Sequence, residues 1–258
     1  MKIADVDFNI APGGSGRSKY EQGVSLEMSP LFDFYKEPWV LLKHLVRELT
    51  VAHLAVKYTD MELLPRNLTL VDAGCGFCEL SALLKRARKV GGFRLDYIGI
   101  DIDEDKQRVS KLIDKDVDFR IHDLRDLKMF TPRSVECVVL NGVLEHFLKP
   151  DGEMVLEQLT SILSLDGIFI LDYATPTSRL RRNNKFHLYE WTNEEVRDSL
   201  EKLGYEILDD FCLAVPEKDW DIHDDRFDRI PQELVRAVAS VLSTSEGNDG
   251  ITIARRLT

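Results

Sequence analysis

The sequence lacks long apolar runs and has no excess of positive charge. No stretch approaches the roughly 20 apolar residues that a membrane-spanning helix needs, and residues 1–12 lack the apolar centre of a signal peptide. The 258 residues carry a net charge of −11, whereas proteins that bind nucleic-acid backbones usually show a basic footprint. We therefore expect a cytoplasmic protein with no membrane partner, for which nucleic acid is possible but not favoured.

Cysteines are few, and only two of the four are close in sequence. Cys75 and Cys78 have the C-x-x-C spacing of redox motifs, at the expected start of a helix, where thiolates are favoured. A structural zinc site would need four ligands, yet there is no second C-x-x-C and no paired histidines, and Cys137 and Cys212 lie in strand-like segments. We therefore expect no metal and reduced thiols beside a cofactor, with a redox role as the alternative.

The most informative stretch is Val71–Cys78, where an apolar run ends in closely spaced glycines and a helical pattern follows at once. Residues 68–71 have the apolar character of a strand, and apolar residues recur at helical intervals between 80 and 90. Gly74 and Gly76 lie between the two. Glycine lets the backbone approach a ligand closely, and the first turn of a helix presents unpaired N–H groups. This turn is therefore a candidate cofactor contact.

Polar residues also follow the next predicted strands. Further strands are predicted at 94–103, 117–121, 135–140 and 168–172. Asp101 lies near the end of the first of these, Asp123 follows the second, and Asn141 follows the third. In a parallel sheet, ligands bind beyond the carboxyl ends of the strands where the strand order reverses, and a carboxylate there can accept both hydroxyls of a ribose. The arrangement indicates a nucleoside-bearing cofactor.

The chain resembles the class I S-adenosylmethionine (SAM) dependent methyltransferases in four motifs, which are Asp72–Gly76, Asp101, His122–Leu124 and Asn141–His146. The resemblance covers about residues 68–213 and the last strand. It implies a doubly wound, seven-stranded, mostly parallel sheet with an antiparallel last strand, plus an N-terminal helical cap. It also implies SAM as the cofactor.

The resemblance further implies a role for the residues at each strand end. Gly74 and Gly76 would pass beside the methionine part of SAM, Asp101 would hold the ribose diol, and Asp123 with the backbone of Leu124 would contact adenine. The expected cofactor-binding residues are Asp72, Gly74, Cys75, Gly76, Asp101, Ile102, Asp123, Leu124 and Asn141.

A nicotinamide-binding fold is the main alternative, because it uses a similar strand, glycine turn and acidic residue. Its fingerprint G-x-G-x-x-G needs a third glycine, and counting from Gly74 that position is Glu79. A carboxylate there would repel a pyrophosphate, whereas SAM has no phosphate and carries a positive sulfonium. The resembled methyltransferases often have a glycine where this chain has Cys78. We therefore expect SAM rather than a nicotinamide cofactor.

Segments outside the strands and their helices are expected to form the acceptor side. Residues 1–66 are expected to form a flexible arm and a helical cap, with apolar residues at helical spacing between 30 and 58, and residues 67–258 the SAM-binding domain. Two loops of that domain, at 173–191 and 214–230, are expected to contact the substrate, because loops commonly carry binding residues.

Candidate catalytic residues lie past the fourth and fifth predicted strands. Methyl transfer from a sulfonium is an in-line displacement, so alignment and desolvation matter most, and a general base helps when the acceptor is a hydroxyl or a protonated amine. The candidate catalytic residues are His146, His187 and Tyr189. The candidate substrate-binding residues are Tyr173, Arg179, Arg182 and Glu190.

The acceptor is expected to be a small molecule or metabolite, methylated on oxygen or nitrogen. The Asp/Asn-Pro-Pro-Tyr/Phe tetrapeptide of amino-group nucleic-acid methyltransferases is absent, since the chain has Asn141–Leu144 at that place, and the Pro-Cys nucleophile of cytosine C5 enzymes is missing. Basic residues between 179 and 185 keep a nucleotide, sugar-phosphate or nucleic-acid acceptor as an alternative. A SAM-binding module without turnover is the third interpretation.

Overall fold

Strands with apolar side chains on both faces form the centre of the protein. The computed structural model describes residues 38–60, 63–91, 94–176, 186–213, 243–244 and 249–257. Along β1 (Asn67–Ala73), Leu68 and Leu70 belong to the core on one face of the sheet, while Val71 and Ala73 belong to the core on the other. A strand that is buried on both faces requires helices on both sides of the sheet.

The sheet is doubly wound and mostly parallel. β1 pairs in parallel with β2 (Arg94–Asp101) and β4 (Val135–Asn141), and β3 (Asp118–Ile121) and β5 (Leu163–Ala174) continue the parallel order on either side. The full strand order is β3-β2-β1-β4-β5-β8-β6-β7. The order reverses between β1 and β4, so the space beyond the carboxyl ends of these two strands is where a ligand is expected.

The last strands are antiparallel. β8 (Asp249–Arg256) lies between β5 and β6 (Tyr205–Leu213) and runs antiparallel to both, and β7 (Ser243–Thr244) pairs with the outer edge of β6. The predicted seven-stranded, mostly parallel sheet with an antiparallel last strand is confirmed, and the two-residue β7 adds a short strand at its edge.

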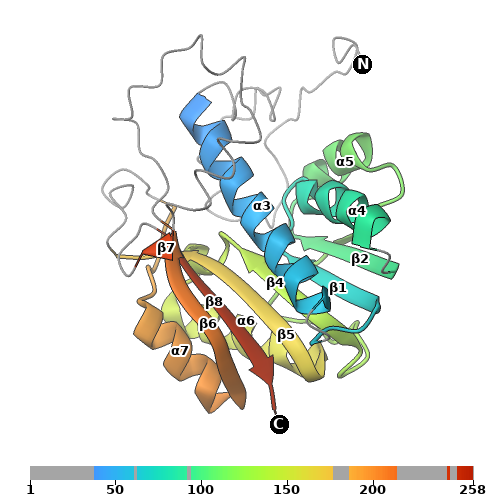
Figure 1. The fold of residues 1–258 in the computed structure, drawn as a ribbon. Helices are drawn as coiled ribbons and strands as arrows, with labels where there is room; N and C mark the ends of the chain where they lie inside the picture. The colour runs from blue at the N-terminus through green and yellow to red at the C-terminus, as the bar shows by residue number, and fades with distance from the viewer. Residues whose placement is uncertain are drawn as a thin grey trace.

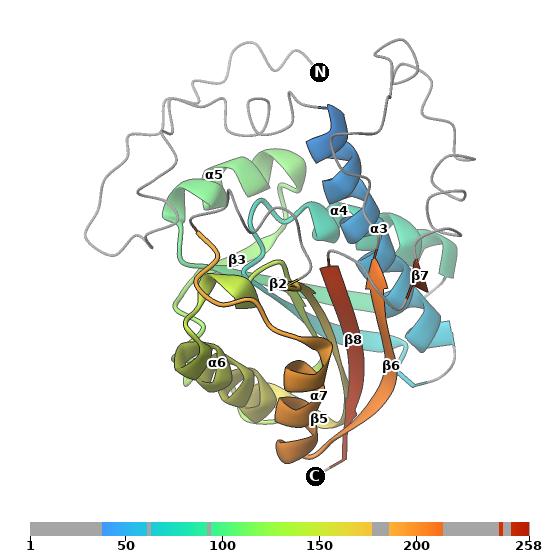
Figure 2. The same ribbon diagram turned by 90° about the vertical axis from the view of Figure 1, so that its left-hand side faces the viewer.

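Helices cover both faces of this sheet (Figures 1 and 2). α3 (Pro38–Asp60) and α4 (Glu79–Gly91) contribute to the core on one face. α6 (Lys149–Ile162) and α7 (Asn193–Lys202) contribute to the core on the other. α5 (Glu104–Ile113) packs beside β3 and α4. The predicted N-terminal helical cap is thus α3, which lies across one face of the sheet (Figure 1).

Two element boundaries test the sequence patterns directly. Thr192 and Glu195 have the spacing of a capping box, and both of its hydrogen bonds form at the start of α7. β5 begins at Leu163, ahead of the predicted start at residue 168. Its first five residues mix Leu163 and Leu165 with Ser164, Asp166 and Gly167, Asp166 has a φ of 61°, and the register with β4 shifts there, so no continuous apolar run reveals this part of the strand.

Several predicted segments lie outside the described residues. They are the arm at the start of the chain, the middle of the loop 173–191 and the whole loop 214–230. The division of the chain at residue 66 therefore stays a prediction. Among the helices that the structure describes, none combines the length and the apolar character needed to cross a membrane.

Candidate cofactor and acceptor site

The glycine turn after β1 is bound to the end of β2. The backbone N–H groups of Gly74 and Cys75 both donate hydrogen bonds to the carbonyl of Ile100, at 2.7 and 2.9 Å. Gly74 and Gly76 have φ angles of 75° and 55°, which favour glycine. A Cβ atom at Gly74 would overlap the side chain of Val143, whereas one at Gly76 would meet no atom within 4 Å. Gly74 therefore packs against the loop after β4, and Gly76 borders a space where a ligand can approach the backbone.

Cys78 occupies the position where the resembled methyltransferases often have glycine. Its φ of 61° is the left-handed conformation that glycine adopts most readily. The sulfur atoms of Cys75 and Cys78 both lie against Gly99 of β2, where an added Cβ would come within 2.8 and 2.7 Å of them. Both thiols are free and buried, and burial raises the pKa of Cys75. The C-x-x-C pair therefore packs against β2 beside the glycine turn.

Asp101, the last residue of β2, gathers hydrogen bonds from several elements. Its carboxylate accepts from the backbone N–H of Gly76 and of Asp103, each at 3.0 Å, and from the ammonium of Lys106 at 3.2 Å. The N–H of His122, after β3, donates to the Asp101 carbonyl at 3.0 Å. The glycine turn and the ends of β2 and β3 therefore meet at one buried carboxylate, which is the convergence expected from the sequence.

Asp123 and Leu124 follow His122 at the same edge of the sheet. The carboxylate of Asp123 lies 2.6 Å from the guanidinium of Arg125, and this contact holds the pKa of Asp123 below its usual value. Leu124 is buried, whereas the side chain of Ile102 is 39% exposed. This edge of the sheet therefore has the exposed apolar side chain of Ile102 and the Asp123 carboxylate, which Arg125 holds in place.

A second group of charged residues lies where α3 meets β4 and β5. Arg47 of α3 forms an ion pair with Asp172 of β5. Glu48 of α3 accepts a hydrogen bond from Nδ2 of Asn141, at 2.6 Å. The Oδ1 atom of Asn141 is buried and has no hydrogen-bond partner among the described residues. α3 thus places charged side chains at the carboxyl end of the sheet, next to a predicted cofactor residue.

Burial of these carboxyl groups favours their protonated forms. It raises the pKa of Asp72 to about 7, although the hydrogen bond donated by the Tyr97 hydroxyl acts in the opposite direction. The pKa of Glu48 is raised well above its usual value, first by burial and then by the charge of Asp72. A positively charged ligand group that entered here would favour the ionised carboxylates and be stabilised by them. The group is therefore suited to a ligand ammonium.

Arg47, Glu48 and Lys106 were not among the predicted site residues. A sequence signal did exist for Glu48, because Val51 and Ala52 follow it at three and four residues and are buried on the same face of the helix. A carboxylate on the apolar face of a helix costs free energy unless it has a partner or a function. The spacing of Lys106 from Asp101 gives no comparable signal.

On the acceptor side, two distant segments meet beyond β4. The backbone N–H groups of Leu188 and Tyr189 donate to the carbonyl of Glu145, at 2.8 and 3.3 Å. These bonds join the segment 186–191 to the short 3₁₀-helix η2 (Leu144–His146). The candidate residues from both segments are therefore held close together.

The two predicted histidines are neighbours. The rings of His146 and His187 lie edge to face, with 5.5 Å between their centroids. Nδ1 of His146 lies 3.1 Å from the carbonyl oxygen of Phe186, and Nδ1 of His187 lies 3.2 Å from Oε1 of Glu190. Burial lowers the pKa of His146, so its imidazole is neutral near pH 7.

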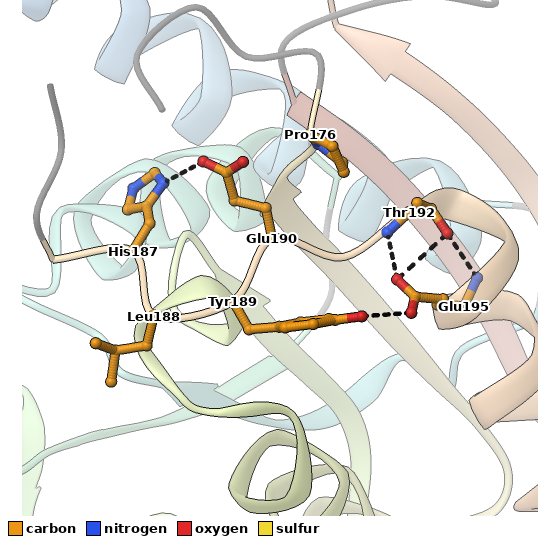
Figure 3. A pocket seen from close by; sticks show the side chains of 7 residues that line it. All are labelled: Pro176, His187, Leu188, Tyr189, Glu190, Thr192 and Glu195. Carbon is orange, nitrogen blue, oxygen red and sulfur yellow. Dashed lines mark hydrogen bonds and ion pairs between the residues drawn. The ribbon is translucent and has the colours of Figure 1, made fainter. Parts of the chain in front are cut away.

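A pocket of about 330 Å³ opens at this place. Its lining residues, drawn in Figure 3, are Pro176, His187, Leu188, Tyr189, Glu190, Thr192 and Glu195. The hydroxyl of Tyr189 donates to Glu195, which forms the capping box of α7 with Thr192, and this bond raises the pKa of Tyr189. Tyr189 is therefore held against the start of α7, while His187 and Glu190 face each other across another part of the pocket (Figure 3).

The other predicted substrate residues do not join this pocket in the described part of the chain. Tyr173 is fully buried, and its hydroxyl lies 3.0 Å from Oγ1 of Thr252 on β8. Side chains alternate along a strand, so Tyr173 shares the inner face of β5 with Phe169 and packs in the core, which corrects the expectation of a substrate contact. Arg179 and Arg182 lie outside the described residues.

Comparisons with known proteins agree with this architecture. A family model described as a methyltransferase domain matches residues 64–230. A search among curated proteins found no match.

Solved structures share the fold at low sequence identity. A SAM-dependent methyltransferase from Archaeoglobus fulgidus is 17% identical with a TM-score of 0.55, and the match covers 81% of this chain and 94% of that chain. Magnesium protoporphyrin IX methyltransferase from Synechocystis PCC 6803, solved with bound SAM, is 17% identical with a TM-score of 0.57, over 88% and 92% of the two chains. The cyclase SpnF is 16% identical with a TM-score of 0.50, over 74% and 76%. The same fold therefore carries more than one reaction, and the chemistry must be argued from the site.

Proposed function

The chain belongs to the methyltransferase domain family with S-adenosylmethionine (SAM) as its cofactor, and on this premise we propose that it methylates an oxygen or nitrogen atom of a small molecule or metabolite. The observation that carries the proposal is the meeting of Gly76 and Asp101 at the carboxyl ends of β1 and β2, next to the strand switch point, together with a pocket lined by residues that follow β5. Pockets of roughly 300–1,000 Å³ commonly hold small ligands, and this pocket falls at the lower end of that range.

We place SAM along the carboxyl ends of β1, β2 and β4. Its ribose hydroxyls would donate to Asp101, sharing or replacing the contact of Lys106, and its methionine part would pass Gly76, where no side-chain atom stands in the way. Its ammonium would lie near Asp72 and Glu48, whose pKa values are raised chiefly by burial, so that a positive charge beside them would favour their ionised forms. The other proposed cofactor contacts are Cys75, Ile102, Asp123, Leu124 and Asn141, with Gly74 supporting the turn through Val143.

We place the acceptor in the pocket between η2 and the start of α7. His187 and Glu190 line it, and His146 lies against His187, so polar acceptor atoms in the pocket would meet an imidazole and a carboxylate. The ring of Tyr189 forms part of the wall. A general-base role for either histidine stays a prediction.

The transfer itself needs little covalent chemistry from the protein. When bound, SAM would supply a methyl group on a positively charged sulfur, so that a lone pair of the acceptor atom would form the new bond to carbon while the sulfur would leave as the neutral thioether of S-adenosylhomocysteine. The acceptor then loses a proton to a base or to water. The protein contributes by holding the acceptor in line with the carbon–sulfur bond and by excluding water.

Product formation from acceptor pools tests the proposal. Purified protein is incubated with SAM and pooled metabolites, and S-adenosylhomocysteine is quantified, with a parallel series containing nucleotides, sugar phosphates and oligonucleotides. Product from the metabolite pools alone supports the proposal. Product from the phosphate-bearing series alone would overturn the acceptor class. Thermal stabilisation by SAM with no product in any pool would indicate a binding module without turnover.

A further inference from the structure

Three potential metal ligands from two segments converge beside the acceptor pocket. Glu145, His146 and His187 each offer a ligand atom, and these atoms all lie within 4.8 Å of one another. Two imidazoles and one carboxylate are a ligand set that suits divalent transition metals such as zinc, iron(II) and cobalt(II). The backbone bonds from Leu188 and Tyr189 to Glu145 keep the two segments in register, so the three side chains are positioned by the fold.

The hydrogen bonds of the two histidines orient them for metal ligation. Nδ1 of His146 faces the carbonyl oxygen of Phe186, which can only accept, so Nδ1 carries the proton. Nδ1 of His187 faces Oε1 of Glu190, which by the same reasoning favours the proton on Nδ1. In both rings the lone pair is then on Nε2. Metal-bound histidines almost always have their other nitrogen donating to a carbonyl or a carboxylate in this way.

Glu145 supplies an independent observation. Glu145 is only 3% exposed, and its Oε2 atom has no hydrogen-bond partner among the described residues. A buried carboxylate oxygen without a partner costs free energy, and coordination of a cation would offset that cost. The charge of Lys106 acts on His146 and opposes a cation, but Lys106 is paired with Asp101.

We propose that Glu145, His146 and His187 bind one divalent transition-metal ion at the rim of the acceptor pocket. Three protein ligands leave at least one coordination position for water or for an acceptor oxygen. An acceptor hydroxyl bound there would lose its proton more readily, which replaces the general-base role expected for the histidines. This last step rests on the proposed methyl transfer, whereas metal binding itself does not. The sequence predicts no metal, because it has no second C-x-x-C and no closely spaced pair of histidines. His146 and His187 are far apart in sequence and meet only in the folded protein.

Cobalt binding tests the site without reference to activity. The full-length protein is treated with a chelator, dialysed and titrated with Co²⁺ while visible absorption is recorded, and Zn²⁺ is then added as a competitor. We expect one Co²⁺ per chain, displaced by Zn²⁺, without the intense thiolate-to-cobalt band that the buried cysteines would produce. Glu145→Gln and His187→Ala should each weaken binding at least tenfold, and Glu190→Gln, which removes the carboxylate behind His187, should weaken it about tenfold.

The controls separate ligand loss from damage to the fold. His53→Ala removes an exposed histidine of α3 and should leave Co²⁺ binding unchanged. Circular dichroism and thermal unfolding establish that each variant is folded, and Glu190→Gln serves where a ligand variant fails to fold. Absence of Co²⁺ and Zn²⁺ binding to the wild-type protein, or equal binding in the triple variant Glu145→Gln, His146→Ala, His187→Ala, would overturn the inference. Production of S-adenosylhomocysteine by a protein that binds no metal would leave the proposed function standing and refute this site alone.

Discussion

The backbone N–H of Gly76 donates a hydrogen bond of 3.0 Å to Oδ2 of Asp101. This bond couples the glycine turn after β1 to the carboxylate at the end of β2, so a ribose held by Asp101 would lie beside the open space at Gly76. Hydrogen bonds to charged groups contribute about 1.5–3 kcal/mol each. We therefore expect Asp101→Ala to weaken SAM binding at least tenfold, measured by isothermal titration calorimetry.

The matched control for this change is Asp96→Ala, because Asp96 lies on the same strand with an exposed side chain. It should leave the dissociation constant of SAM unchanged. Equal affinity in wild type and Asp101→Ala, with both proteins folded, would show that Asp101 is not the ribose contact.

Substitution of the two glycines of the turn is expected to have different effects, on stability at Gly74 and on SAM binding at Gly76. Gly74→Ala would force a Cβ into Val143, so we expect a loss of stability, and Val143→Ala in the same chain should restore part of it. Gly76→Ala has room for the Cβ and should cost only about 1 kcal/mol for its positive φ, but the new methyl group enters the proposed SAM path. Urea unfolding and SAM titration measure the two effects. Weaker SAM binding in Gly74→Ala, with a larger loss of stability in Gly76→Ala, would place the cofactor beside Gly74 instead.

Asp72 is expected to make stability depend on pH. Its pKa rises from an ordinary 3.8 to about 7 on folding, so the folded state holds this proton more tightly than the unfolded state. The resulting stabilisation is present below pH 4 and is lost as the pH rises through 7. Asp72→Asn should therefore have a higher Tm than wild type at pH 8, with a difference that shrinks towards pH 4, and should bind SAM more weakly. A variant with a lower Tm at pH 8 and unchanged affinity would contradict the assignment.

Cys78 should reverse the usual order of alanine and glycine. Both substitutions remove a fully buried sulfur, but only glycine relieves the left-handed backbone, which costs other residues roughly 1–2 kcal/mol. Glycine also has more conformational entropy to lose on folding, which costs about 0.5–1 kcal/mol, so Cys78→Gly should be as stable as Cys78→Ala or up to about 1.5 kcal/mol more stable in urea unfolding. Cys137, equally buried on β4, is the control, and there alanine should be the more stable. The same order at both positions would refute this account.

Tyr173 should affect stability but not catalysis. Tyr173→Phe removes the hydroxyl that lies 3.0 Å from Thr252 Oγ1, so we expect a loss of about 1 kcal/mol in the free energy of unfolding. KM for the acceptor and kcat should stay at wild-type values, because the side chain lies in the core. An increase in KM without a change in stability would return Tyr173 to the substrate site.

The fold, and the meeting of the strand ends where the cofactor contacts are expected, follow local patterns and could therefore be predicted from the sequence. Apolar runs mark the central strands, and Gly76 and Asp101 stand at strand ends that a parallel sheet brings together. The ion pair between Arg47 of α3 and Asp172 could not be predicted, because it depends on which turn of the helix lies over β5.

The acceptor side depends even more on tertiary contacts. The sequence predicts His146 and His187 as separate candidate catalytic residues. Their contact depends on backbone hydrogen bonds to the Glu145 carbonyl, and no sequence pattern predicts these bonds. Tyr173 shows the converse case. The alternation of side chains along β5 predicts that Tyr173 lies on the same face as Phe169, in the core. The expectation of a substrate contact followed instead from its position at the start of the loop 173–191.

A crystal structure of the protein with S-adenosylhomocysteine tests the central claim most directly. We predict ribose hydroxyls within hydrogen-bond distance of the Asp101 carboxylate, the amino acid part beside Gly76, and the ammonium of Lys106 moved from its 3.2 Å contact. A nucleoside bound elsewhere, with Asp101 still paired to Lys106, would contradict the account.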